Sequence, residues 1–293
     1  MSAAEPVCVW AVGAELGEGP LWDAATRSVY FVDIKGRQVH RYGEQGERRS
    51  WPAPQQVGFI VPLAAGGFAC GLQDGLYRFC QASGDFTLLR HVEQELPSNR
   101  FNDGFVDAEG CLWFGSMDDA ERRPSGALYR LSRDGQLSIA DRDYVITNGP
   151  AMSPDGRTLY HTDTLEKTVF RFDVLADGSL GGKRPFARIA GSGHPDGMAV
   201  DAEGCVWIAL FGGGRIERYA ACGDYLGSVA FPCSNVTKLA FGGADLRTVY
   251  ATTAWKGLTA AQRAREPLAG ALFSFRTAAP GLAPHPLSAG ASA

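Results

Sequence analysis

Val106-Asp-Ala-Glu-Gly-Cys-Leu-Trp113 and Val200-Asp-Ala-Glu-Gly-Cys-Val-Trp207 are two copies of one eight-residue stretch, and they differ at a single position. In each copy an apolar residue precedes a short polar segment with a glycine, and a second apolar segment ends on tryptophan. This order is typical of the end of one strand, a tight turn and the start of the next strand. The pair therefore indicates an internal repeat.

Looser copies of this stretch recur along the chain. The six copies lie 40 to 47 residues apart and end at Tyr30, Cys70, Trp113, Tyr160, Trp207 and Tyr250. A second series of short apolar strands, most with a basic residue before the last large side chain, also has six copies, from Val39-His-Arg-Tyr42 to Leu272-Phe-Ser-Phe275. The alternative is a β-sandwich whose strands resemble one another by chance. Two separate series of segments, each with six copies, argue against it.

Repeats of this length, built from short strands rich in valine and aromatic residues, are typical of propeller blades. We therefore predict an all-β fold, a six-bladed β-propeller, as a single domain over residues 1–293. A helical pattern occurs only near residues 259–265. Residues 277–293 are rich in alanine, proline, glycine and serine, and this composition predicts a loose tail.

Composition and charge exclude several classes of partner. The net charge is −4, and no run of lysine or arginine offers a surface for nucleic acid. The seven cysteines are scattered and contain no Cys-x-x-Cys pair, which favours reduced thiols over disulfides or a thiolate zinc site. No apolar stretch is long enough for a membrane span. We expect a cytoplasmic protein that binds neither nucleic acid nor membranes, and the sequence carries no indication of its oligomeric state.

Four of the six repeats carry an oxygen-bearing side chain followed by a glycine, ten to fifteen residues before the aromatic position. These residues are Glu18, Asp103, Asn148 and Asp196. Equivalent positions in a propeller are equally far from the axis. We therefore expect the four side chains to converge at one mouth of the central channel.

Converging carboxylates resist ionisation unless a cation lies among them. A set of carboxylates and an amide suits a hard divalent ion such as Ca²⁺, Mg²⁺ or Mn²⁺, whereas zinc and ferrous iron are less favoured by ligand type. The alternative is that these Asp-Gly and Asn-Gly pairs are only turn residues. That alternative is weaker for Glu18, because glutamate is a poor turn residue.

The segment Arg100-Phe-Asn-Asp-Gly104 places a cation and two oxygen-bearing groups within four residues. Arg100 and Asn102 share one face of an extended strand, which suits binding of the hydroxyl or carbonyl oxygens of a ligand. A surface loop with a local ion pair is the alternative.

Four motifs span nearly the whole chain: Leu16-Gly-Glu-Gly-Pro-Leu-Trp22, Asn99-Arg-Phe-Asn-Asp-Gly104, Ile146-Thr-Asn-Gly-Pro150 and His194-Pro-Asp-Gly-Met198. In this order they resemble the gluconolactonase, regucalcin and senescence-marker-protein family. Two further segments, Tyr160-His-Thr-Asp-Thr-Leu-Glu-Lys167 and Asn235-Val-Thr-Lys238, are similar to bacterial aldonolactonases such as xylonolactonase.

The resemblance implies a six-bladed propeller with one divalent metal ion held by Glu18, Asn148 and Asp196. It implies that Arg100 and Asn102 contact the substrate. Members of the family have been found with calcium, zinc, manganese or iron, so the resemblance leaves the ion open, and the ligand types add magnesium.

Many family members have a glutamate shortly after the third-blade strand that contacts the sugar. Here Ala120 falls at that place, and we expect Asp118 or Asp119 to substitute for it.

The expected function is metal-dependent hydrolysis of a sugar lactone, a pentonolactone or hexonolactone, to the aldonic acid. Asp196 is the expected general base, acting on a water molecule. Two rival functions stay open: an organophosphate-type phosphotriesterase on the same scaffold, and a calcium-binding regulatory propeller without catalysis.

Overall fold

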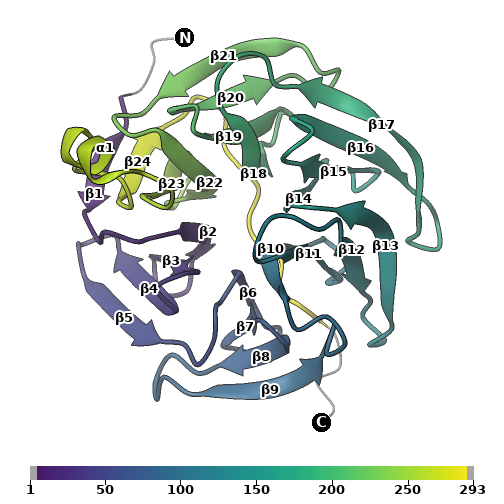
Figure 1. Ribbon diagram of the computed structural model, residues 1–293. Coiled ribbons are helices and arrows are strands. Elements are labelled where there is room, and N and C mark those ends of the chain that lie inside the picture. Colours follow the sequence, from purple (N-terminus) through teal and green to yellow (C-terminus); the bar gives the residue numbers. More distant parts are fainter. Residues whose placement is uncertain (1–4, 289–293) are drawn as a thin grey trace.

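The computed structural model describes residues 5–288 as six four-stranded antiparallel sheets set radially around a central channel (Figure 1). Within the first five sheets the strands follow chain order from the channel outward. We call the sheets blades 1 to 6. The all-β fold and the six-bladed β-propeller predicted from the repeats are confirmed.

The first five blades are continuous segments of the chain. Blade 1 contains β2 (Gly17–Asp23), β3 (Ser28–Asp33), β4 (Gln38–Gly43) and β5 (Arg48–Pro52). Blade 2 contains β6 (Phe59–Pro62), β7 (Phe68–Gly71), β8 (Gly75–Phe79) and β9 (Phe86–His91). Blade 3 contains β10 (Asn99–Val106), β11 (Leu112–Asp118), β12 (Gly126–Leu131) and β13 (Leu137–Tyr144). Blade 4 contains β14 (Thr147–Met152), β15 (Thr158–Asp163), β16 (Thr168–Val174) and β17 (Leu180–Arg188). Blade 5 contains β18 (His194–Val200), β19 (Val206–Phe211), β20 (Arg215–Tyr219) and β21 (Tyr225–Ala230).

Blade 6 closes the ring with strands from both ends of the chain. It contains β22 (Asn235–Gly242), β23 (Thr248–Ala254), β24 (Leu272–Arg276) and, at its outer edge, β1 (Val7–Trp10). The short helix α1 (Ala260–Arg265) precedes β24, and Thr259 caps its first turn. No helix of residues 5–288 is long and apolar enough to cross a membrane.

The repeated eight-residue stretch forms a turn held by one carboxylate. Asp107 Oδ1 accepts hydrogen bonds from the backbone N–H groups of Glu109 (3.0 Å) and Cys111 (2.9 Å), and Asp107 Oδ2 accepts one from Trp113 Nε1 (2.8 Å). Asp201 makes the same three bonds in blade 5. The two copies are alike because one aspartate accepts three hydrogen bonds at each turn, two of them from buried donors.

Aromatic residues at the repeat positions fill the spaces between neighbouring blades. Tyr30 of blade 1 lies against Phe68 of blade 2, with ring centroids 4.4 Å apart. Trp207 of blade 5 lies edge-on to Phe241 of blade 6, with centroids 6.1 Å apart. Burial of these large rings between sheets supplies much of the apolar contact that holds the ring of blades together.

The predicted loose tail is wrong for residues 277–288, which we call the C-terminal segment. This segment, yellow in Figure 1, crosses the channel from blades 5 and 6 to blades 2 and 3. Gly281 N–H donates to Leu246 O (2.7 Å) at one side, and Leu287 N–H donates to Pro62 O (2.8 Å) at the other. Backbone hydrogen bonds to distant blades, invisible in local composition, fix the segment. Residues 289–293 lie outside the described residues.

Candidate functional site

The four oxygen-bearing residues of the repeat lie on the innermost strands and are buried. Each lies at an irregularity in strand pairing, at Glu18 in β2, Asp103 in β10, Asn148 in β14 and near Asp196 in β18. A β-bulge redirects side chains from the regular alternation of a strand. The structure thus brings together at the channel residues that are widely separated in sequence.

The glycines that follow these residues make room in a crowded channel. A Cβ atom on Gly104 would lie 2.7 Å from the ring of Phe59, and one on Gly197 would lie 2.5 Å from Cγ of Lys238. These glycines therefore reflect close packing of the inner strands as well as turn formation.

The three carboxyl groups influence one another strongly. Burial, followed by the charge of Asp103, raises the pKa of Glu18 to about 8. Burial, followed by the charges of Glu18 and Asp103, raises the pKa of Asp196 well above its usual range. Burial also raises the pKa of Asp103, although Lys238 opposes this shift. Without a further cation, the group favours partial protonation.

The donor set fits a divalent cation. Within residues 5–288, Glu18 and Asp196 form no ion pair, and Asp103 Oδ2 is buried without a hydrogen-bond partner. The amide of Asn148 is oriented by Thr164, whose Oγ1 accepts from Asn148 Nδ2 (2.9 Å) and donates to Pro195 O (3.0 Å). Carboxylate and amide oxygens of this kind are the ligands that calcium, magnesium and manganese prefer.

A cavity of about 230 Å³ opens beside this cluster. A cavity of this size holds several water molecules and admits a small ligand. Its wall combines charged, amide and apolar groups from several blades: Glu18, Asp196, Glu121, Arg100, Lys256, Asn102, Asn148, Thr164, His194, Leu16, Met117, Ile146, Leu165 and Phe211.

Arg100 and Asn102 both line the cavity and connect its wall to the carboxylate cluster. Arg100 is 2% exposed; its Nε donates to Asp119 Oδ1 (2.7 Å) and its Nη1 donates to Asn102 Oδ1 (2.5 Å). Asn102 Nδ2 donates in turn to Asn148 Oδ1 (2.8 Å). This chain of hydrogen bonds fixes the orientation of both side chains before any ligand enters.

The two aspartates expected to contact substrate do not line the cavity. Asp118 accepts hydrogen bonds from the backbone N–H of Arg122 (3.0 Å) and from Arg123 Nη2 (2.8 Å). Its carboxylate therefore stabilises the conformation of the loop after β11. Asp119 Oδ1 accepts from Lys35 Nζ (2.6 Å) as well as from Arg100. Their carboxylates are paired with neighbouring cations, and neither residue lines the cavity, so the structure does not place them where the substrate contact was expected.

Glu121 and Lys256 line the cavity and were missed. They form an ion pair between the loop after β11 and the segment after β23. Glu121 lies one residue beyond Ala120, in a left-handed backbone conformation with φ of 58°. Counting residues across this loop led to Ala120, whereas the acidic side chain that lines the cavity is the next one along the chain.

The other candidate groups lie elsewhere or are satisfied. His194 lines the cavity, with Nδ1 3.2 Å from Thr164 O, whereas His161 is buried against Tyr144. Asp201 and Glu203 lie near Cys205, but Arg218 already pairs with both carboxylates at 2.6 and 2.7 Å.

Residues 16–255 match the sequence model of the SMP-30/Gluconolactonase/LRE-like region. The chain belongs to this family. The resemblance seen in the four sequence motifs is thereby confirmed, and those motifs carry the residues that meet at the channel.

Relatives within the SMP-30/gluconolactonase family cover almost the whole chain. A 6-deoxy-6-sulfogluconolactonase of Pseudomonas putida is 35% identical over 97% of this chain and 98% of its own length. An L-arabinolactonase of Azospirillum brasilense is 36% identical over 92% of this chain and 90% of its own. The solved structure of a calcium-binding protein, regucalcin, from Agrobacterium tumefaciens superposes with a TM-score of 0.92 at 27% identity, covering 98% and 97% of the two chains.

Proposed function

We propose that this protein is a divalent-metal-dependent hydrolase that opens a sugar lactone, a pentonolactone or hexonolactone, to the aldonic acid. The observation that carries the proposal is the convergence of Glu18, Asn148 and Asp196 beside the oriented pair Arg100 and Asn102 in one cavity. Two relatives named as sugar lactonases support the reaction class.

Glu18, Asn148 and Asp196 would hold the metal ion. When bound, a divalent ion supplies Lewis-acid polarisation of the lactone carbonyl. The oxygen donors favour calcium, magnesium or manganese, a regucalcin neighbour is described as calcium-binding, and zinc and ferrous iron remain candidates by resemblance.

The protein's own groups perform the remaining tasks. Asp196 accepts a proton from the attacking water, whose oxygen bonds to the carbonyl carbon. The ring C–O bond then breaks, and Asp196 returns the proton to the leaving ring oxygen, which becomes a hydroxyl. Arg100, Asn102 and Glu121 bind the sugar hydroxyls and hold the ring in a reactive pose. Asp119 acts on substrate only through Arg100, which it positions.

The test is an assay of metal-stripped protein on xylono-, arabino-, galactono- and gluconolactone, with each divalent ion added in turn and acid release followed. We expect a metal-dependent rate that Asp196→Asn lowers by about 100-fold or more. The control Asp245→Ala, at an exposed ion pair with Arg276, should keep the rate. If none of the four lactones is hydrolysed in a metal-dependent way, the proposal is wrong.

The charged and amide groups in the cavity wall support this function over the rivals. A phosphotriesterase pocket is expected to be more apolar than one lined by Arg100, Asn102 and Glu121. A purely regulatory calcium site does not require oriented groups for sugar hydroxyls. None of the seven cysteines forms a disulfide in the structure. The cytoplasmic location expected from the sequence stays a prediction.

A further inference from the structure

A lysine lies inside the channel among the carboxylates. Lys238 is on β22 of blade 6, and its Nζ pairs with Asp103 Oδ1 of blade 3 on the opposite side of the ring. Only 9% of the Lys238 side chain and 1% of the Asp103 side chain are exposed. The pairing of β22 with β23 is irregular between Val236 and Lys238, as in the inner strands that carry the metal-ligand candidates.

The surroundings of this ammonium group are strongly acidic. Burial raises the pKa of Asp103 and of Glu18, and the charge of Lys238 opposes this rise in both, so the ammonium group lies within electrostatic reach of both carboxyl groups. Asp103 Oδ2 is buried and has no hydrogen-bond partner among the described residues. Asp103 therefore retains one buried oxygen that no described side chain or backbone group hydrogen-bonds.

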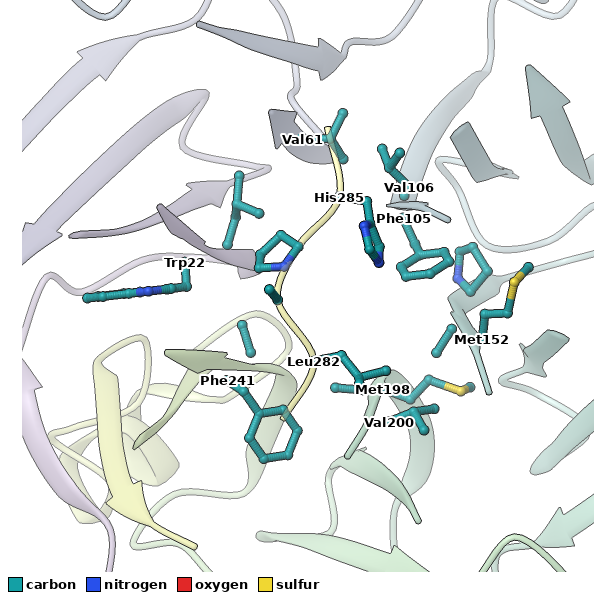
Figure 2. Close-up of a pocket in the computed structure, with 18 of the residues that line it drawn as sticks. Trp22, Val61, Phe105, Val106, Met152, Met198, Val200, Phe241, Leu282 and His285 are labelled. Atoms are coloured by element: carbon teal, nitrogen blue, oxygen red, sulfur yellow. The ribbon is translucent and has the colours of Figure 1, made fainter. Parts of the chain in front are cut away.

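A second, more apolar cavity lies beside the stem of Lys238. The methylene groups of this stem pack against Gly197 and line the cavity, which has a volume of about 200 Å³. Figure 2 shows this cavity, with Met198 and Phe241 in its wall and Leu282 and His285 of the C-terminal segment across it. An ammonium group is costly to place among such apolar groups, so its position beside the carboxylates is favoured.

We propose that Lys238 is a built-in cation that occupies the place of a second divalent ion and so limits the channel to one exchangeable metal ion. The inference rests on the proposed metal site at Glu18, Asn148 and Asp196. Charge balance supports it, because one ammonium and one divalent ion together neutralise the three buried carboxylates Glu18, Asp103 and Asp196. Asp103 therefore forms an ion pair with Lys238 and is not a ligand of the exchangeable ion.

The experiment counts bound calcium per chain by titration calorimetry and by elemental analysis after gel filtration. We expect one ion in the unaltered protein and two in Lys238→Met, where Asp103 is released for a new ion. The double variant Lys238→Met/Asp103→Asn should return to one ion. Lys256→Met is the matched control, because it removes a cation from the wall of the neighbouring cavity, and it should keep one ion.

The outcomes separate this inference from the proposed function. One ion in Lys238→Met overturns the role of Lys238 and leaves the lactonase proposal intact, whereas no ion in the unaltered protein removes the metal site and both proposals with it. If Lys238→Met is unfolded without metal, millimolar calcium should restore its thermal transition. Failure of calcium to do so overturns the inference, because the ion should substitute for the ammonium group.

Discussion

Acidic side chains in the loop after β11 have distinct tasks. Glu121 faces the cavity beside Lys256, whereas Asp118 holds the loop through Arg122 and Arg123. A charge-assisted hydrogen bond from a sugar hydroxyl to a carboxylate contributes about 1.5–3 kcal/mol. The position of one acidic residue in a loop thus decides whether it acts in binding or in loop structure.

We predict that Glu121→Gln raises KM for the preferred lactone about tenfold or more, because the neutral amide forms a weaker hydrogen bond with the hydroxyl. Asp118→Asn should leave KM unchanged. Steady-state kinetics at saturating metal checks both variants. The reverse pattern would return the substrate contact to Asp118.

Two buried histidines link the stability of the fold to pH. Burial lowers the pKa of His161 to about 3 and that of His40 to about 4. Asp141 opposes the shift at His161, while Lys183 adds to it. In the unfolded chain both side chains titrate near 6.5, so below that pH the unfolded state binds protons that the folded state does not.

The unfolding free energy should therefore fall as pH decreases from about 6.5 towards 4, by up to about 1.4 kcal/mol per pH unit for each histidine. His161→Phe should reduce this slope, because the ring would keep its contact with Tyr144 and no longer titrate. Denaturant unfolding in the presence of a chelator, at pH 7 and pH 5, measures the difference. Equal slopes for the variant and the unaltered protein would contradict the assignment.

Repetition explains which site residues could be predicted from sequence. The same position in different repeats is occupied by Glu18, Asn148 and Asp196. Equivalent positions of a propeller lie at equal distances from its axis, so these side chains meet at the channel. Glu121 and Lys256 lie on loops without a repeat, where an offset of one residue changes the side chain that enters the cavity. Lys238 was overlooked because it carries no oxygen and no glycine follows it.

At the scale of single elements, the aspartates Asp107 and Asp201 hold the turns between the first two strands of blades 3 and 5. Asp107→Ala would leave two backbone N–H groups and the indole N–H of Trp113 without an acceptor. We expect a loss of at least about 2 kcal/mol of unfolding free energy, measured by denaturant titration. Asp155→Ala, in an exposed turn of blade 4, is the control and should cost clearly less. Similar losses for both variants would show that burial of the donors is unimportant.

The positions of many strands could be predicted from the sequence, because a turn with a glycine precedes the strand and a large buried residue, aromatic in five of the six repeats, lies within it. The irregular pairing at the inner strands could not be predicted in the same way, because it depends on the approach of neighbouring blades. Gly104 shows this dependence, since the ring that excludes a side chain there belongs to Phe59 of blade 2.

For the whole molecule, the C-terminal segment ties opposite sides of the ring together. Leu287 is 4% exposed and anchors the segment on blade 2, whereas Leu282 of the same segment is 37% exposed. We expect Leu287→Ala to cost about 2–4 kcal/mol and Leu282→Ala to cost less than about 1 kcal/mol, as measured by chemical denaturation. If both substitutions cost the same, the anchoring role of Leu287 is wrong.

Local composition predicted a loose segment there because alanine, proline and glycine rarely form regular elements. The partners of the segment are backbone groups such as Pro62 O and Leu246 O, which are presented only after the blades have assembled. Packing of this kind is a property of the finished ring and leaves no periodic signal in the sequence.

The joining of β1 to β24 in blade 6 has a consequence for biosynthesis. Among the described strands β1 is made first, whereas its partner β24 is complete only after Arg276 has been added. Until then β1 has no strand to pair with, and the open edge of β24 can afterwards accept β1 from its own chain or from a neighbouring chain. Close neighbouring chains therefore favour strand exchange between molecules over closure within one chain.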